Sequence, residues 1–152
     1  MKKRYLIIPI LIIIIIIIII IITCIVFKNK KDDKYYVLKD DKIKSITSIV
    51  GQRKLIKKTN KKYNSTIIKS YKYNKVKDPY TDLSKYILYL EQESNFINTK
   101  NFNLNNNKGS IQLSRYSTNK SYIIIMDINY NSNSYTIRIT RGKGKITPLN
   151  KS

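Results

Sequence analysis

The sequence predicts an α+β protein: an N-terminal single transmembrane helix, a basic juxtamembrane arm, then a small domain with one helix packed on an antiparallel β-meander. Three observations predict this architecture. Residues 5–27 carry no charged side chain and include eleven consecutive isoleucines at 12–22. Residues 80–93 place apolar side chains at helical spacing. Three runs after Gly109 alternate apolar and polar side chains, the period of a strand.

The apolar segment predicts a membrane anchor over residues 1–27, with the lipid bilayer as the partner of residues 5–27. About 20 apolar residues are enough for a helix to cross the hydrocarbon core. Backbone amides in lipid must be bonded within the segment, so even a β-branched run is expected to be helical there. The stretch is longer than the apolar core of a secretory signal, roughly 7–15 residues, and no small-residue cleavage site follows it.

Cys24 leaves a second interpretation of this segment open. A lipoprotein signal places a small residue before the cysteine that is lipidated, and Thr23 is a poor match. Residues 25–27 also continue the apolar run, as a membrane helix would. The sequence therefore favours an uncleaved anchor in which Cys24 is an apolar filler, and lipidation of Cys24 is the alternative.

The orientation of the anchor is only weakly indicated. Three basic residues precede the segment and four follow it before residue 35, so the positive-inside rule hardly discriminates. Long domains translocate largely regardless of charge, and a short basic N-terminus suits the inside. We therefore expect a single-pass protein of the cell membrane whose C-terminal domain lies outside the cytoplasm.

Residues 28–62 are predicted to be a basic juxtamembrane linker that contains a short amphipathic helix. The chain has a net charge of +21, and residues 28–77 hold 17 basic and four acidic side chains. Each lysine close to an anionic membrane surface contributes about 1 kcal/mol of attraction. A solvated linker, or a composition set by AT-rich codons, explains the same charge without a function. The short helix would start at Asp40–Asp41 and end at Gly51, and its apolar side would lie on the membrane or, as is more common for such a stripe, pack on its own domain: Ile43, Ile46, Ile49 and Val50.

Residues 63–147 are predicted to form the small domain, followed by a tail at 148–152. Residues 66–76 are typical of an edge strand protected by lysines. The helix at 80–93 would be capped by Asp78 or Thr81 and would bury one face: Leu83, Tyr86, Ile87 and Leu90. A short strand at 101–104 and a turn at 105–109 are expected next.

The C-terminal part of this domain predicts the meander. The runs 111–115, 122–130 and 135–141 alternate, and the loops 118–120 and 131–134 have the length and composition of hairpin turns. The run 122–130 is apolar on both faces, so it is expected to be the middle strand. Asp127 should be partly buried on the sheet, with Arg138 or Arg115 as a cross-strand partner.

The composition argues against an enzyme. The chain has no histidine, and its one cysteine lies in the anchor. The commonest general base, a thiol nucleophile and a cysteine-based zinc site are therefore excluded. Asp78 and Asp82 are explained as helix-terminal carboxylates rather than an acid pair. Ser117–Lys120 matches a serine–lysine motif only by spacing, because that motif needs a helix. No catalytic residue, cofactor or metal site is predicted.

The remaining signal is an alternation of lysine and tyrosine between residues 61 and 80. It predicts contact with anionic headgroups or cell-wall polymer by a membrane-anchored, non-enzymatic envelope protein. A membrane-tethered protein that binds single-stranded nucleic acid is the alternative, because bases stack on aromatic rings. A tyrosine-rich strand with solvated lysines is the plain structural explanation. Nothing indicates an oligomeric state. The candidate contact residues are Lys57, Lys58, Lys61, Lys62, Lys69, Tyr71, Lys72, Tyr73 and Lys75.

Overall fold

The computed structural model describes residues 12–22, 33–104 and 106–149, in two units, Met1–Lys31 and Asp32–Ser152. In the first unit residues 12–22 are α-helical, and their isoleucine side chains are each 48–57% exposed. Over the ranges that the structure describes, no helix is both long and apolar enough to cross a membrane. Cys24 and the remainder of the predicted anchor lie outside the described residues.

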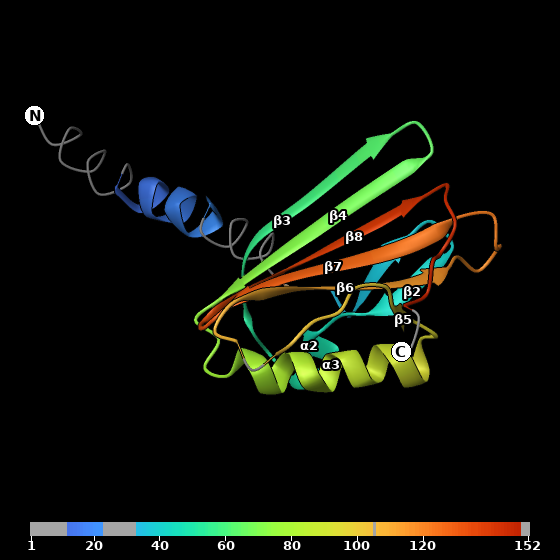
Figure 1. Ribbon diagram of the computed structural model, residues 1–152. Coiled ribbons are helices and arrows are strands. Elements are labelled where there is room, and N and C mark those ends of the chain that lie inside the picture. The colour runs from blue at the N-terminus through green and yellow to red at the C-terminus, as the bar shows by residue number, and fades with distance from the viewer. Residues whose placement is uncertain (1–11, 23–32, 105, 150–152) are drawn as a thin grey trace, which may run out of the picture. The chain divides into compact units, whose positions relative to one another are not determined.

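The second unit is α+β, and its largest part is a six-stranded antiparallel sheet (Figure 1). The strands lie in the order β3-β4-β8-β7-β6-β5. Their bounds are Lys54–Tyr63 (β3), Thr66–Asn74 (β4), Ile97–Asn98 (β5), Gly109–Tyr116 (β6), Ile123–Asn131 (β7) and Ser134–Gly142 (β8). A separate hairpin joins Tyr35–Leu38 (β1) to Asp41–Lys44 (β2), followed by the one-turn helix α2, Thr47–Val50. The long helix α3 spans Pro79–Glu93.

The predicted helix and the predicted antiparallel meander are both confirmed. Helix α3 begins after Asp78, whose carboxylate accepts a hydrogen bond of 3.0 Å from the backbone N–H of Thr81. Pro79 occupies the first turn, where its missing N–H has no consequence. The four residues predicted for the apolar face are all buried. Strand β7 lies between β6 and β8, so the doubly apolar run is an interior strand as expected.

The expectation of a linker over residues 28–62 is corrected for the part that the structure describes. Residues 35–63 contain β1, β2, α2 and β3 and belong to the folded unit. Alternate side chains of the two strands face the core: Tyr36 and Leu38 from β1, and Asp41 and Ile43 from β2. Lys39 lies in the turn between the strands, with a φ of 59°. The apolar stripe that was predicted to be helical is therefore split: Ile43 lies in β2, Ile46 is the N-cap of α2, and Ile49 and Val50 are the last residues of α2.

Two further strand expectations are corrected. Residues 66–74 form β4, but β4 is the second strand of the sheet, because β3 pairs with it and occupies the edge. Five of the ten residues of β3 are lysine, so the lysine protection of the edge belongs mainly to β3. Residues 101–104 form no strand; Phe102 and Leu104 pack against the core from a loop, and the short edge strand is β5 instead.

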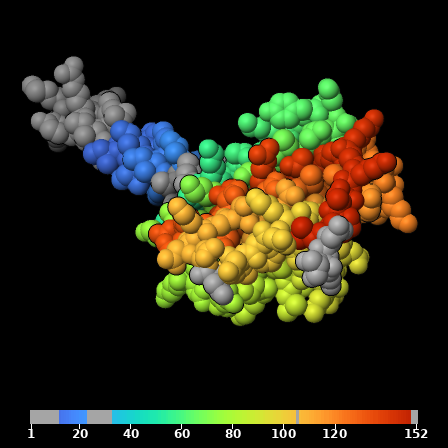
Figure 2. Space-filling model, in the orientation of Figure 1, coloured from blue at the N-terminus to red at the C-terminus, as the bar shows by residue number. Residues whose placement is uncertain are grey.

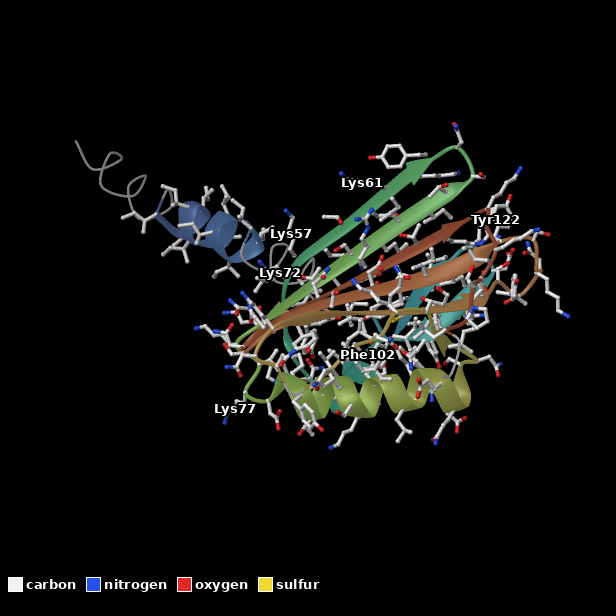
Figure 3. All side chains as sticks on the ribbon, viewed as in Figure 1. Lys57, Lys61, Lys72, Lys77, Phe102 and Tyr122 are labelled. Carbon is white, nitrogen blue, oxygen red and sulfur yellow. The ribbon has the colours of Figure 1, made fainter. Side chains whose placement is uncertain are left out.

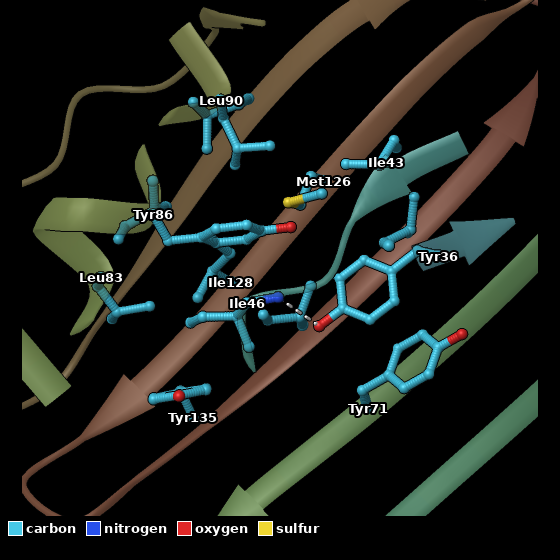
Figure 4. Close-up of a cluster of buried hydrophobic side chains, with 14 of the residues drawn as sticks. Tyr36, Ile43, Ile46, Tyr71, Leu83, Tyr86, Leu90, Met126, Ile128 and Tyr135 are labelled. Carbon is cyan, nitrogen blue, oxygen red and sulfur yellow. Dashed lines mark hydrogen bonds between the residues drawn. The ribbon is translucent and has the colours of Figure 1, made fainter. Parts of the chain in front are cut away.

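The core lies between the sheet and a cover made of α3 and the β1–β2 hairpin (Figure 4). Tyr36 joins the hairpin to the sheet: its ring centroid lies 4.3 Å from that of Tyr71, and its hydroxyl lies 2.9 Å from the hydroxyl of Tyr73. The Tyr86 hydroxyl of α3 donates to the backbone carbonyl of Lys44, 2.9 Å away. These bonds satisfy tyrosine hydroxyls that would be costly to bury alone.

A buried cluster of charged side chains fixes the turn end of the β1–β2 hairpin to the sheet. Asp41 is 1% exposed and accepts hydrogen bonds from Arg115 at 3.2 Å and from Arg141 at 3.4 Å. Its Oδ1 also accepts from the backbone N–H and the hydroxyl of Thr118, each at 2.9 Å. The guanidinium of Arg141 stacks on Tyr122, 3.9 Å from the ring centroid. Asp41 therefore ties β2 to β6, β8 and the loop between β6 and β7.

The partner predicted for Asp127 is corrected as well. Asp127 is half-buried, as expected, but it accepts a hydrogen bond of 2.9 Å from the side-chain amide of Gln112. Arg115 is engaged by Asp41 instead. Arg138 is the residue opposite Asp127 in the register of β7 and β8, yet it makes no ion pair with an acid in the described part of the chain.

Candidate anion-binding surface

The β3–β4 hairpin separates the predicted contact residues onto two faces, because successive side chains of a strand point in opposite directions. Lys58 lies opposite Tyr71 in the register, on the face turned toward the core. Lys57 lies opposite Lys72, and both side chains are exposed. Figure 3 shows Lys57, Lys61 and Lys72 on the side of the sheet away from α3.

Tyr71 and Tyr73 are not on the surface: both are 0% exposed. Tyr71 packs on Tyr36, and the ring of Tyr73 lies 5.2 Å from that of Tyr135. Neither ring is accessible to a base, so their proposed role as stacking platforms is corrected. Tyr71, Tyr73 and Ile67 alternate along β4 and so share one face, which was the sequence signal for burial. The sequence did not predict the β1–β2 hairpin that covers the two tyrosines.

Four of the predicted lysines are also placed elsewhere. Lys58 forms an ion pair with Asp33 on the core side of the hairpin. Lys62 lies opposite Ile67, and Lys69 opposite Ile139, both on that same side. Lys75 follows the end of β4 with a φ of 57°. The structure therefore brings together three of the nine predicted residues on one uncovered face.

A fourth cation joins them. Arg138 lies opposite Ser70 in the register of β4 and β8, and it is exposed on the same side of the sheet as Lys57, Lys61 and Lys72. We call these four side chains the lysine face. Sequence reasoning assigned Arg138 to Asp127, although its alternation with Thr136 and Thr140 already placed it on the polar side of β8.

The electrostatics of the lysine face are one-sided. None of its four cations forms an ion pair with an acid among the residues that the structure describes. Like charges directly opposite each other on paired strands are destabilising, and Lys57 and Lys72 are such a pair. The nearest acid along the same side of the sheet is Asp127 on β7, which is already hydrogen-bonded to Gln112. A surface that gathers four cations on one side of a sheet can bind anions.

The described residues contain no group of histidine, cysteine or acidic side chains arranged to hold a metal ion. No protein-family model matches the chain, and no curated protein and no solved structure matches it.

Proposed function

We propose that this protein is anchored in the cell membrane by residues 5–27 and that its folded unit binds anionic groups through the lysine face, without catalysing a reaction. The anionic groups would belong to lipid headgroups or to a cell-wall polymer, which share phosphate or carboxylate chemistry. One observation carries the proposal: Lys57 and Lys72 lie directly opposite each other with no acid paired to either in the described structure. An anion placed between them would relieve that repulsion.

Support for the anchor comes from the sequence and from the exposure of the helix. The segment 5–27 has 23 residues without a charge, and about 20 are enough to span the hydrocarbon core. The isoleucines at 12–22 surround their helix on all sides and are each about half exposed, 48–57%. Large exposed apolar surfaces mark contacts with membranes or proteins. Lipid is the occupant that suits a helix apolar on every side.

Anion binding is tested with residues 32–152, which contain all the described residues of the hydrophobic core. The fragment should sediment with vesicles that contain acidic phospholipid and not with neutral vesicles. Binding should weaken between low and physiological salt, where the screening length is about 8 Å. Exchanging Lys57, Lys61 and Lys72 for glutamine should weaken it by up to about 3 kcal/mol, at about 1 kcal/mol per lysine.

The matched control exchanges three exposed lysines on β2 and in two loops for glutamine: Lys42, Lys108 and Lys120. An equal loss in the control would show that net charge, and not the lysine face, drives binding. Purified anionic cell-wall polymer in place of vesicles separates the two sources of the anion. Tighter binding to single-stranded DNA than to either anion would show that nucleic acid is the ligand. No binding to any of them at low salt would show that the positive charge reflects codon composition and not a binding function.

The anchor is tested with the full-length protein. Cys24→Ser should leave it membrane-bound and at full length, because the apolar segment and not a lipid on Cys24 holds it. Release into the soluble fraction, or a fatty-acid label that disappears with Cys24, would show lipidation instead. Protection of residues 28–152 from external protease in intact cells would reverse the proposed orientation.

A further inference from the structure

A pocket of 380 Å³ lies beside the first turn of α3, away from the lysine face. Five cationic side chains from three segments line it: Arg53, Lys54, Lys75, Lys77 and Lys85. Its two acids, Asp78 and Asp82, do not balance that charge. The volume lies within the range of small-molecule sites, about 300–1,000 Å³.

Both acids are already engaged by other donors. The two oxygens of Asp78 accept from the Thr81 hydroxyl at 2.6 Å and from the Thr81 backbone N–H at 3.0 Å. Asp82, 4% exposed, accepts from Arg53 at 2.5 and 2.6 Å and from the Tyr135 hydroxyl at 3.2 Å. The carboxylates of the pocket are therefore hydrogen-bonded to Thr81, Arg53 and Tyr135, and neither forms an ion pair with a lysine of the described residues.

Arg53 is held in place with donors to spare. Its guanidinium has five N–H donors, of which two bind Asp82 and one binds the backbone carbonyl of Gln52 at 2.8 Å. The side chain is 28% exposed at the pocket. A guanidinium fixed by a carboxylate on one side presents its remaining N–H groups in a defined direction, which suits a phosphate oxygen.

The lysines add charge from independent backbone positions. Lys54 begins β3, and Lys77 lies just before the helix cap. Lys75 takes a φ of 57°, held by its N–H bond to the Asn74 side chain and by the bond from the Val76 N–H to the Asn133 carbonyl. Lysine rarely adopts this left-handed conformation. None of these three lysines pairs with an acid among the described residues.

We infer that this pocket binds a small, multiply charged anion, of the chemistry of a diphosphate or a phosphorylated metabolite. Arg53 donates to it directly, and the lysines neutralise its remaining charge. The cations of the pocket outnumber its acids by three, so an anion with two or more charges balances the pocket better than an anion with a single charge. The site is separate from the lysine face, because Lys57, Lys61 and Lys72 do not line it.

The test is calorimetric titration of the full-length protein, in neutral detergent, with inorganic pyrophosphate. Binding should saturate at one site per chain and weaken with salt. Lys75→Asn and Lys77→Gln should each raise Kd about 2- to 5-fold, the usual range for one exposed charge. Lys57→Gln should change Kd by less than either, although it removes the same charge.

Lys75→Asn also separates binding from folding. Asparagine tolerates the left-handed conformation better than lysine, so the variant should melt at the same temperature as the parent or higher when no ligand is present. Pyrophosphate should raise the melting temperature of the parent more than that of the variant. Absence of saturable binding, or an equal loss of affinity with Lys57→Gln, would overturn the site, and neither result bears on vesicle binding by the lysine face.

Discussion

Lys57 of β3 and Lys72 of β4 are directly opposite partners on the side of the sheet that α3 does not cover. The hairpin that carries them is drawn in green in Figure 2, at the rim of the folded unit. The two like charges repel each other across the paired strands. Such a site lowers the stability of the free protein and raises its affinity for anions, so stability and binding should respond oppositely to substitution.

Lys72→Glu should therefore stabilise the folded unit. The exchange turns a like-charged cross-strand pair into an opposite-charged one, worth about 0.2–1 kcal/mol in the free energy of unfolding. The gain should shrink in concentrated salt, and binding to acidic vesicles should fall. Urea denaturation of the variant measures the gain. If Lys108→Glu, an exposed lysine in a turn, gives the same increase, relief of net charge and not the pair is responsible.

The second prediction concerns the buried cluster around Asp41. Asp41→Asn should lower the free energy of unfolding by about 3–5 kcal/mol, because it leaves the buried charge of Arg141 and the partly buried charge of Arg115 without a counter-charge. The neighbouring Asp40 is exposed, so Asp40→Asn should change stability by less than about 0.5 kcal/mol. Similar denaturation midpoints for the two variants would show that β1 and β2 are not integral to the fold.

Local periodicity was enough to predict α3 and the strands β6, β7 and β8 from the sequence. Leu83, Tyr86, Ile87 and Leu90 repeat at the helical period, and Ile124, Met126 and Ile128 alternate. Each pattern is complete within one short segment and needs no knowledge of the remainder of the chain.

The role of residues 33–62 depends on distant partners and could not be predicted that way. Asp41 bonds residues 74 and 100 positions away, and Tyr36 bonds Tyr73, 37 positions away. The high lysine content of this segment is also typical of a solvated linker, whereas five of its lysines belong to the edge strand β3. The candidate site was only partly predictable for the same reason. Alternation along the strands placed Lys57 and Lys72 on a polar side, but the burial of Tyr71 depends on Tyr36 of the β1–β2 hairpin, which packs on it.

The third prediction tests the cover that α3 provides. Leu90→Ala should cost about 2–5 kcal/mol in the free energy of unfolding, because the side chain is 0% exposed and its removal leaves a cavity. Leu88 is the matched control on the same helix, since it is 53% exposed. Leu88→Ala should change stability by about 0.5 kcal/mol or less. Equal losses would mean that the helix does not bury the face assigned to it.

The last prediction concerns the pH dependence of the start of α3. The hydroxyl and the backbone N–H of Thr81 donate to the Asp78 carboxylate and hold its pKa below the ordinary value of 3.8, with a smaller contribution from the charge of Lys85. A depressed pKa in the folded state means that the unfolded state binds the proton more readily. The stabilisation is therefore complete above about pH 4 and is lost as the pH falls through the lower, folded value.

Asp78→Asn isolates this effect, because asparagine caps a helix about as well as aspartate but has no charge to titrate. The stability of the parent relative to Asp78→Asn should be constant from about pH 7 to pH 5 and should fall below about pH 4. Thr81→Val removes the hydroxyl that contributes most to the lowered pKa of Asp78. In this variant the pKa of Asp78 should rise toward its ordinary value, and the loss of stability at acid pH should be smaller than in the parent. Urea denaturation across this pH series measures all three proteins. Parallel curves for the parent and Asp78→Asn would show that the Asp78 cap does not contribute to acid sensitivity.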